Sequence, residues 1–162
     1  MKVAGLLIVF LISTLTTPDL SELRKNYPKA SNSEAITNAL QNQLVDVTKE
    51  DEKILVAYKG AVSTLMAKYA KGIKNKKDFF KTGAELIEYA VEKEPENLEI
   101  RCIRLSVQEN SPKIVGYKDN IPEDKQFLIN NYKSASSTPV TTFIKNYVMG
   151  SALFDTAEKQ LF

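Results

Sequence analysis

Apolar residues recur at intervals of three and four along most of the chain, which gathers side chains on one face of an α-helix. The same spacing predicts helices over residues 19–29, 49–71, 77–93, 96–109 and 122–133, and another from Glu34 onward. No useful length of the chain alternates with the period of two that is typical of strands. We therefore predict an all-α fold of six or seven helices, in stacked antiparallel hairpins that form an irregular bundle. The clearest stripe is Val140, Phe143, Ile144, Tyr147 and Val148.

Start and stop signals separate these stripes. Residues 31–34 have the spacing of a capping box, and residues 48–51 repeat it with Asp in place of Glu. Pro95 ends one helix and Gly150 another, before a tail of one or two helical turns. The lysine-rich sequence KGIKNKK, residues 71–77, is interpreted as a turn. Small residues indicate a close helix neighbour on one element, at Gly60, Ala61, Ala67 and Ala70.

The first 17 residues have the pattern of a bacterial secretory signal. Lys2 is followed by an apolar run from Val3 to Leu15, and small polar residues come next. The run is shorter than the roughly 20 residues of a membrane-spanning helix. We predict a signal peptide at 1–17, one mature domain at 18–162, and export to the periplasm. An N-terminal core helix or an uncleaved anchor is the alternative.

Composition limits the chemistry that this chain performs. Its 162 residues are 43 % apolar and 26 % charged, which is ordinary for one domain with its own core. The chain has no histidine and one cysteine, which excludes histidine-dependent catalysis, His-ligated zinc and an internal disulfide. Single, scattered glycines exclude a phosphate-binding loop. We predict no cofactor and no enzymatic activity, and the net charge of +2 gives no reason to expect a nucleic-acid partner.

A basic patch with interleaved aromatic residues joins two of the predicted helices. Such a patch allows contact with anionic lipid headgroups or with another polyanion. The alternative is a solvated turn between helices, because an acidic run follows directly. The patch consists of Lys68, Lys71, Lys74, Lys76, Lys77 and Lys81.

The stretch NLEIRCIRLSVQ, residues 97–108, places two arginines in an apolar helix. At 100° per residue, Arg101, Arg104 and Gln108 form a polar seam between two apolar flanks, so this helix is predicted to pack on both sides. An unpaired buried charge is very costly, which leaves two interpretations. The seam is a clamp for an anion or a partner's carboxylates, or it forms structural ion pairs with carboxylates of adjacent helices.

Two other features contain reactive groups. The carboxylates Asp119, Glu123 and Asp124 are of the kind that performs acid–base chemistry or binds calcium. Their spacing does not fit a calcium loop, and the last two lie where a helix N-terminus favours negative charge. Cys102 lies in mid-helix with no histidine to lower its pKa, so we interpret it as a core residue.

Residues 84–107, AELIEYAVEKEPENLEIRCIRLSV, resemble the junction between two tetratricopeptide repeats. Ala90 and Pro95 match the alanine near the end of one repeat and the proline that opens the next. Ile87 stands where an aromatic residue is usual, and no second copy recurs at a period near 34 residues. The resemblance implies stacked helical hairpins rather than peptide binding.

The chain is also similar to a group of small exported helical proteins of Bacteroidota-type bacteria. The similarity lies in LVAYKGA (55–61), in residues 86–113 and in EDKQFLINNY (123–132). It implies export and a helical fold, and it supplies no catalytic residue.

These features predict an exported, non-catalytic interaction or structural module whose partner is a protein. Contact with a membrane surface through the basic patch is a further possibility. One alternative is a histidine-independent hydrolase or transferase, which would need a carboxylate pair with a raised pKa in a pocket. The other is a carrier of a small apolar ligand, which would need a sizeable apolar cavity.

Overall fold

A computed structural model of the chain describes residues 17–162. Every regular element in this range is helical, which confirms the all-α prediction for these residues. In chain order the elements are α1 (Leu20–Ala30), α2 (Glu34–Gln43), α3 (Lys53–Tyr69), α4 (Ile73–Lys93), α5 (Leu98–Asn110), η1 (Lys113–Val115), α6 (Ile121–Asn131), η2 (Tyr132–Ser134), α7 (Thr138–Gly150) and α8 (Thr156–Lys159), where η marks a 3₁₀ turn.

The described residues contain eight α-helices rather than six or seven. The eighth is α8 (Thr156–Lys159), the short helical turn expected in the C-terminal tail, which the count of six or seven left out. Asp155 caps it by accepting a bond from the Glu158 backbone N–H, while the Glu158 side chain accepts one from the Asp155 N–H. This reciprocal capping box stabilises even one turn.

The prediction that residues 71–77 form a turn is wrong, because α4 already begins at Ile73. Residues 70–72 separate the two helices: Ala70 has extended backbone, and Gly72 has a φ of 80°, which glycine adopts without strain. The lysines that follow are good helix formers. Three members of the basic patch, Lys74, Lys76 and Lys77, therefore lie on the first turns of α4.

The long helix α3 begins at Lys53 instead of at residue 49. The Thr48 backbone N–H and hydroxyl both donate to the Asp51 carboxylate, at 2.7 and 2.9 Å. These bonds close a separate turn before the helix. The residues predicted to cap α3 therefore do form side-chain hydrogen bonds, but these bonds stabilise the turn and not the start of the helix.

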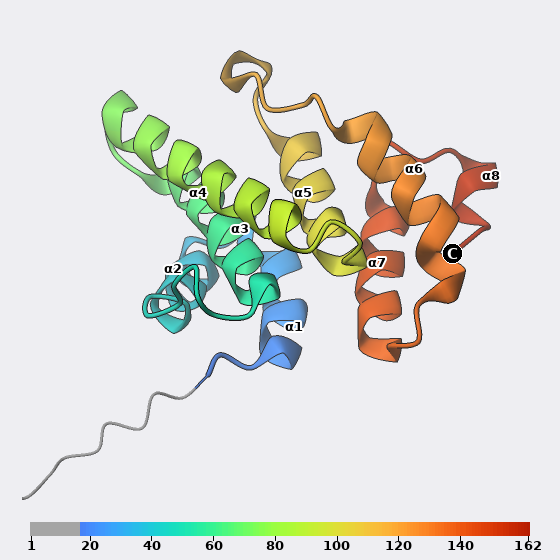
Figure 1. The fold of residues 1–162 in the computed structure, drawn as a ribbon. Helices are drawn as coiled ribbons and strands as arrows, with labels where there is room; N and C mark the ends of the chain where they lie inside the picture. Colours follow the sequence, from blue (N-terminus) through green and yellow to red (C-terminus); the bar gives the residue numbers. More distant parts are fainter. Residues whose placement is uncertain (1–16) are drawn as a thin grey trace, which may run out of the picture.

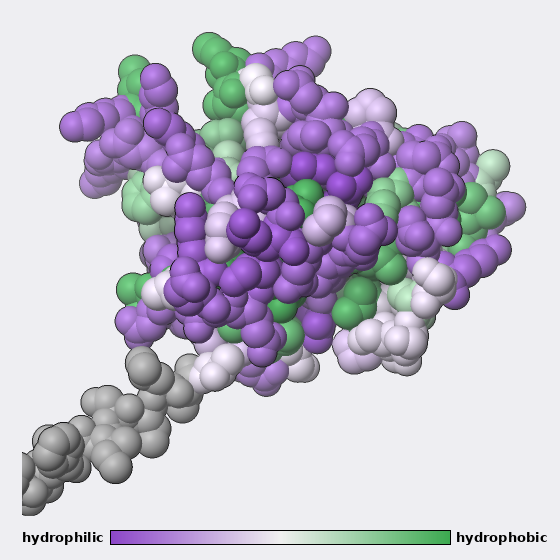
Figure 2. Space-filling model, in the orientation of Figure 1, coloured by the Kyte–Doolittle hydropathy of each residue, from purple (hydrophilic) through white to green (hydrophobic). Residues whose placement is uncertain are grey.

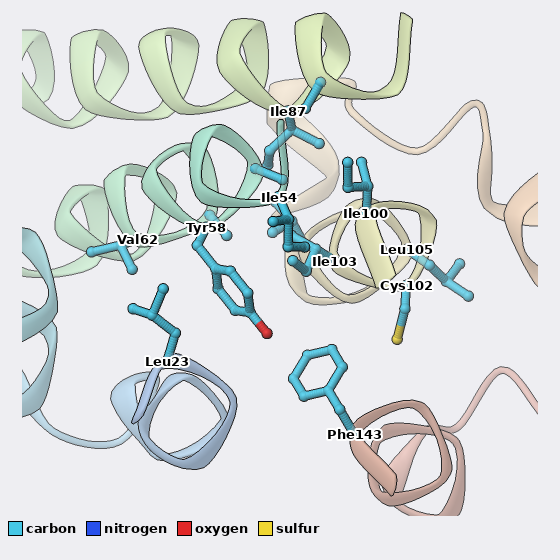
Figure 3. Close-up of a cluster of buried hydrophobic side chains, with 14 of the residues drawn as sticks. Leu23, Ile54, Tyr58, Val62, Ile87, Ile100, Cys102, Ile103, Leu105 and Phe143 are labelled. Carbon is cyan, nitrogen blue, oxygen red and sulfur yellow. The ribbon is translucent and has the colours of Figure 1, made fainter. Parts of the chain in front are cut away.

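The core lies around α5, which packs against α3, α4, α6 and α7 (Figure 1). Figure 3 shows Cys102 directed toward Phe143 of α7, whereas Ile103 points toward Tyr58 of α3. Leu23 of α1 approaches the same cluster from a third side. Because α5 buries side chains on several faces, its position determines where its polar side chains meet the rest of the fold.

The pair α3 and α4 is held unusually close by two glycines. A Cβ added at Gly60 would lie 2.6 Å from the Gly83 carbonyl oxygen, and one added at Gly83 would lie 2.5 Å from that of Gly60. Real Cβ atoms essentially never come so near to another atom. The sequence predicted a close neighbour at Gly60, and the structure shows that Gly83 is its counterpart.

The predicted signal peptide at 1–17 lies outside the described residues except for Thr17. Among the helices of residues 17–162, none combines the length and the apolar character that a membrane crossing requires.

Candidate functional site

The arginine seam of α5 faces the first turn of α6, where Asp124 is completely shielded from solvent. Arg104 Nε donates to Asp124 Oδ2 at 2.7 Å and its Nη2 donates to Oδ1 at 2.8 Å. Its Nη1 donates to Glu88 Oε2 of α4 at 2.9 Å. One guanidinium thus joins three helices and uses all three of its nitrogens.

Arg101 lies one turn earlier and shares these carboxylates. Its Nη2 donates to Glu123 Oε1 at 2.6 Å. Its Nε lies 2.6 Å from Asp124 Oδ1 but forms no aligned hydrogen bond, so this second contact is an ion pair by proximity only. The guanidinium also stacks 4.6 Å from the ring centre of Phe127.

Burial and pairing act in opposite directions on the charges of this cluster. Burial raises the pKa of the Asp124 carboxyl above its ordinary value, and the two arginines oppose that effect. Burial lowers the pKa of Arg104, but bonding to Asp124 and the charge of Glu88 raise it above its ordinary value on balance. The hydrogen bond from Arg101 lowers the pKa of the exposed Glu123.

The third member of the seam, Gln108, is fully buried. Its Nε2 donates to Asn120 Oδ1 at 3.1 Å, and its Oε1 has no hydrogen-bond partner among the described residues. The structure therefore brings Arg101, Arg104 and Gln108 against α6 and its preceding turn. Because carboxylates of the same chain already bind both guanidinium groups, an external anion would have to displace them.

Two further polar clusters attach α5 to other helices. Glu99, at its N-terminal end, accepts two bonds of 2.8 Å from Arg24 of α1 and one of 2.7 Å from the Tyr58 hydroxyl. Glu109, near its C-terminal end, accepts from the Tyr147 hydroxyl at 2.7 Å and from the Ser151 hydroxyl. These partners could not be predicted from the sequence, because the paired residues lie 38 to 75 positions apart.

The reactive groups considered from the sequence are enclosed by packing. Cys102 is buried and its pKa is raised well above the ordinary thiol value, chiefly by that burial. Of the carboxylate cluster, Glu123 and Asp124 lie on the first turn of α6, as expected, and face the arginines, while Asp119 is exposed. No cluster of three potential metal ligands occurs within residues 17–162.

A large groove opens elsewhere, between α4, the C-terminal ends of α1, α3 and α5, the η1 segment and α7. Its volume is about 1790 Å³. One wall is a full face of α4, because its lining residues there recur every three or four positions from Ile73 to Glu92. We call this space the α4 groove.

Two projections carry exposed aliphatic side chains at the rim of the α4 groove. Figure 2 shows hydrophobic patches at the ends of two projections, over the start of α4 and over the segment between α5 and α6. Ile73 is 87 % exposed at the first, and Ile114 is 95 % exposed at the second. Val115 beside it also lines the groove. A sequence pattern could have pointed to these exposed side chains: in KGIK (71–74) and in KIVG (113–116), aliphatic residues stand among lysine and glycine, which favour the surface.

The predicted basic patch divides between the groove and open solvent. Lys71 and Lys74 are exposed and do not line it. Lys68 donates to the Ser31 carbonyl oxygen, and Lys81 lies 3.7 Å from Glu85. Four members of the patch line the α4 groove, Lys68, Lys76, Lys77 and Lys81, and Lys49 lines it as a fifth lysine.

A second hollow, of about 380 Å³, lies on another face, between α3 and α4. Polar residues such as Gln41, Lys59 and Asp78 make up much of its lining. It is much smaller than the α4 groove.

Comparison with protein-family models, with curated proteins and with solved structures gave no match to this chain.

Proposed function

We propose that this protein is an exported, non-catalytic interaction module that binds a partner protein in the α4 groove. The proposal includes the periplasmic location predicted from residues 1–17 and the similarity to small exported proteins of Bacteroidota-type bacteria. It also includes tetratricopeptide-like stacking of α4 on α5 as part of an array of antiparallel hairpins. In this arrangement the arginine seam of α5 is architecture, and the groove beside α4 is the binding surface.

The observation that carries this proposal is the exposure of Ile73 and Ile114 on the rim of one groove. Single exposed aliphatic residues are common on protein surfaces. These two come from separate elements, border the same concave surface and project almost completely into solvent. Burying each of them against a partner is worth about 1.5–3 kcal/mol.

The non-catalytic assignment is supported by the state of the carboxylates and the thiol. Asp124 has a raised pKa, but both of its oxygens bind arginine and the residue borders neither hollow. Cys102 is buried in the core. An acid or a nucleophile must reach its substrate, and these two groups are enclosed by the fold.

A photo-crosslinking amino acid at Ile114 tests the proposal in the cells that make the protein. The matched control is the same amino acid at Val45, which is 59 % exposed but lies outside the α4 groove. We expect a discrete adduct from position 114, and none from position 45. Equal adducts from both positions, or none from 114, would contradict the proposal.

A further inference from the structure

We infer that the partner presents an acidic, amphipathic α-helix to the α4 groove. This inference rests on the proposed function and adds the chemistry and the shape of the bound segment. It follows from the size of the groove, from the arrangement of its apolar rim and from the charges left without partners along it.

The size of the groove indicates a polypeptide segment rather than a small molecule. Small-ligand pockets hold about 300–1,000 Å³, and the α4 groove holds about 1790 Å³. An α-helix that is 10–12 Å wide and rises 1.5 Å per residue would fill this volume with about three or four turns. The groove therefore matches a short helix.

The apolar positions of the groove match the stripe of an amphipathic helix. Ile73 and Phe80 of α4 line one side, seven residues apart, which places them two turns apart on one face. Ile114 lines the opposite side, from the η1 segment. A helix that lies between them would bury one apolar face and leave its polar face toward the rim.

The charges of the groove favour an acidic helix over a basic one, because the carboxylates of the groove already have hydrogen-bond or ion-pair partners within the chain. Glu88 accepts from Arg104 and from the Tyr117 hydroxyl, and Glu109 accepts from Tyr147 and Ser151. The exposed carboxylates Glu85 and Glu92 each have a lysine partner in the chain.

The lysines of the groove are less completely paired. Neither Lys76 nor Lys77 has a carboxylate of residues 17–162 within ion-pair distance. Both are exposed and line the groove between Ile73 and Phe80. Charges of the opposite sign on a partner would complement them and accelerate its association.

The test measures binding of designed helices by fluorescence. The chain contains no tryptophan, so one tryptophan in the probe reports binding without background. The probe is a peptide of about 16 residues with leucines at helical spacing on one face and glutamates on the other. Three comparison probes are the same peptide with lysine for glutamate, the same peptide with glutamine for glutamate, and a scrambled acidic peptide without the stripe.

We expect the acidic amphipathic peptide to bind at least about tenfold more tightly than any comparison probe, and less tightly as salt is raised. Lys76→Glu/Lys77→Glu should reverse this preference, so that the lysine peptide binds better. Because the reversal is a gain of binding, a variant that fails to fold cannot mimic it. Lys25→Glu/Lys133→Glu, at two exposed lysines outside the groove, should leave binding unchanged.

The outcomes separate this inference from the proposed function. If the neutral or basic amphipathic peptide binds as well as the acidic one, the acidic chemistry is wrong while a helix-binding groove stands. If no peptide binds but position 114 crosslinks in cells, the helical occupant is wrong. Preferential binding to vesicles of phosphatidylglycerol and phosphatidylethanolamine, lost in Ile73→Ser/Ile114→Ser, would replace the protein partner by an anionic membrane.

Discussion

Arg104 binds both carboxylate oxygens of Asp124, at 2.7 and 2.8 Å, where Asp124 has no exposure to solvent. A bidentate pair of this kind fixes the angle of α6 against α5 as well as their separation. Arg101 adds a second positive charge to the same carboxylate. The Asp124 side chain is therefore the point on which the packing of α6 depends.

Asp124→Asn should destabilise the protein by about 3–5 kcal/mol, because it leaves two largely buried arginines without their shared negative charge. Urea denaturation followed by circular dichroism measures this loss. Glu123→Gln is the matched control, since Glu123 is 58 % exposed, and it should cost less than about 1 kcal/mol. Equal losses in the two variants would contradict a dominant role for Asp124.

Arg101→Met/Arg104→Met separates the two interpretations of the seam. If the arginines form structural ion pairs, their removal leaves the Asp124 carboxylate buried without a partner. We therefore expect the double variant to unfold or to lose about 3–5 kcal/mol of its free energy of unfolding. Adding Asp124→Leu should restore most of that stability, because an apolar trio replaces the whole cluster. A double variant that keeps full stability but loses a partner would instead establish a clamp.

Gly60→Ala should destabilise the protein by about 1–3 kcal/mol, although alanine favours a helix. The new methyl group meets the Gly83 carbonyl oxygen, which is backbone and cannot rotate away. Gly150→Ala provides the control, because nothing lies within 4 Å of a Cβ built there. The midpoints of urea unfolding compare the two variants, and an unchanged midpoint for Gly60→Ala would refute the close approach of α3 and α4.

The protein should lose stability as the pH rises above about 10. Burial raises the pKa of Tyr27 from 10.0 to about 12, and burial also raises the pKa of Tyr58, Tyr117 and Tyr147. A folded-state pKa above the unfolded value means that folding favours the neutral phenol. The resulting stability is complete below pH 10 and is lost as the pH passes through the folded values.

Urea denaturation at a series of pH values, with phenolate absorbance recorded in parallel, measures this effect. Tyr58→Phe should be less stable at neutral pH, because Glu99 loses a hydrogen bond, and should show a smaller loss in alkali. An identical alkaline loss in wild type and Tyr58→Phe would remove Tyr58 from the explanation.

Cys102 should not react with a thiol reagent such as dithionitrobenzoate while the protein is folded. The thiol is buried and its pKa is raised, so little thiolate exists to react. One thiol per chain should become reactive in denaturant. Rapid reaction of the native protein would show that α5 is accessible and would revive Cys102 as a candidate nucleophile.

Much of the fold could be predicted from helical periodicity. Seven segments have apolar residues at helical spacing, and this pattern can be recognised without knowledge of the tertiary structure. The 97–108 stretch was also predicted to have two apolar flanks and a polar seam, and α5 has both. What failed were local details that depend on single residues. Thr48 and Asp51 close a turn instead of starting a helix, and only the three residues 70–72 separate α3 from α4.

The candidate site was less accessible to sequence reasoning. The basic patch could be found because its lysines are close in sequence. In contrast, Ile73 and Ile114 lie 41 positions apart, and only the fold places them at the same groove. The carboxylates that pair with the arginine seam could not be predicted either, because the chain contains many acidic residues. The packing of α6 against α5 makes Asp124 the buried partner of the arginines. From the sequence alone, Asp124 and its neighbour Glu123 are equally good candidates.

The central position of α5 has a consequence for the order in which the chain can fold. Its partners Arg24 and Tyr58 precede it, but Asp124, Tyr147 and Ser151 follow it. During synthesis from the N-terminus, the two arginines have no carboxylate of α6 until residues 123 and 124 appear, and Glu109 has neither hydroxyl partner until residue 147. The polar contacts that attach α6 and α7 to α5 therefore form only after most of the chain has been synthesised.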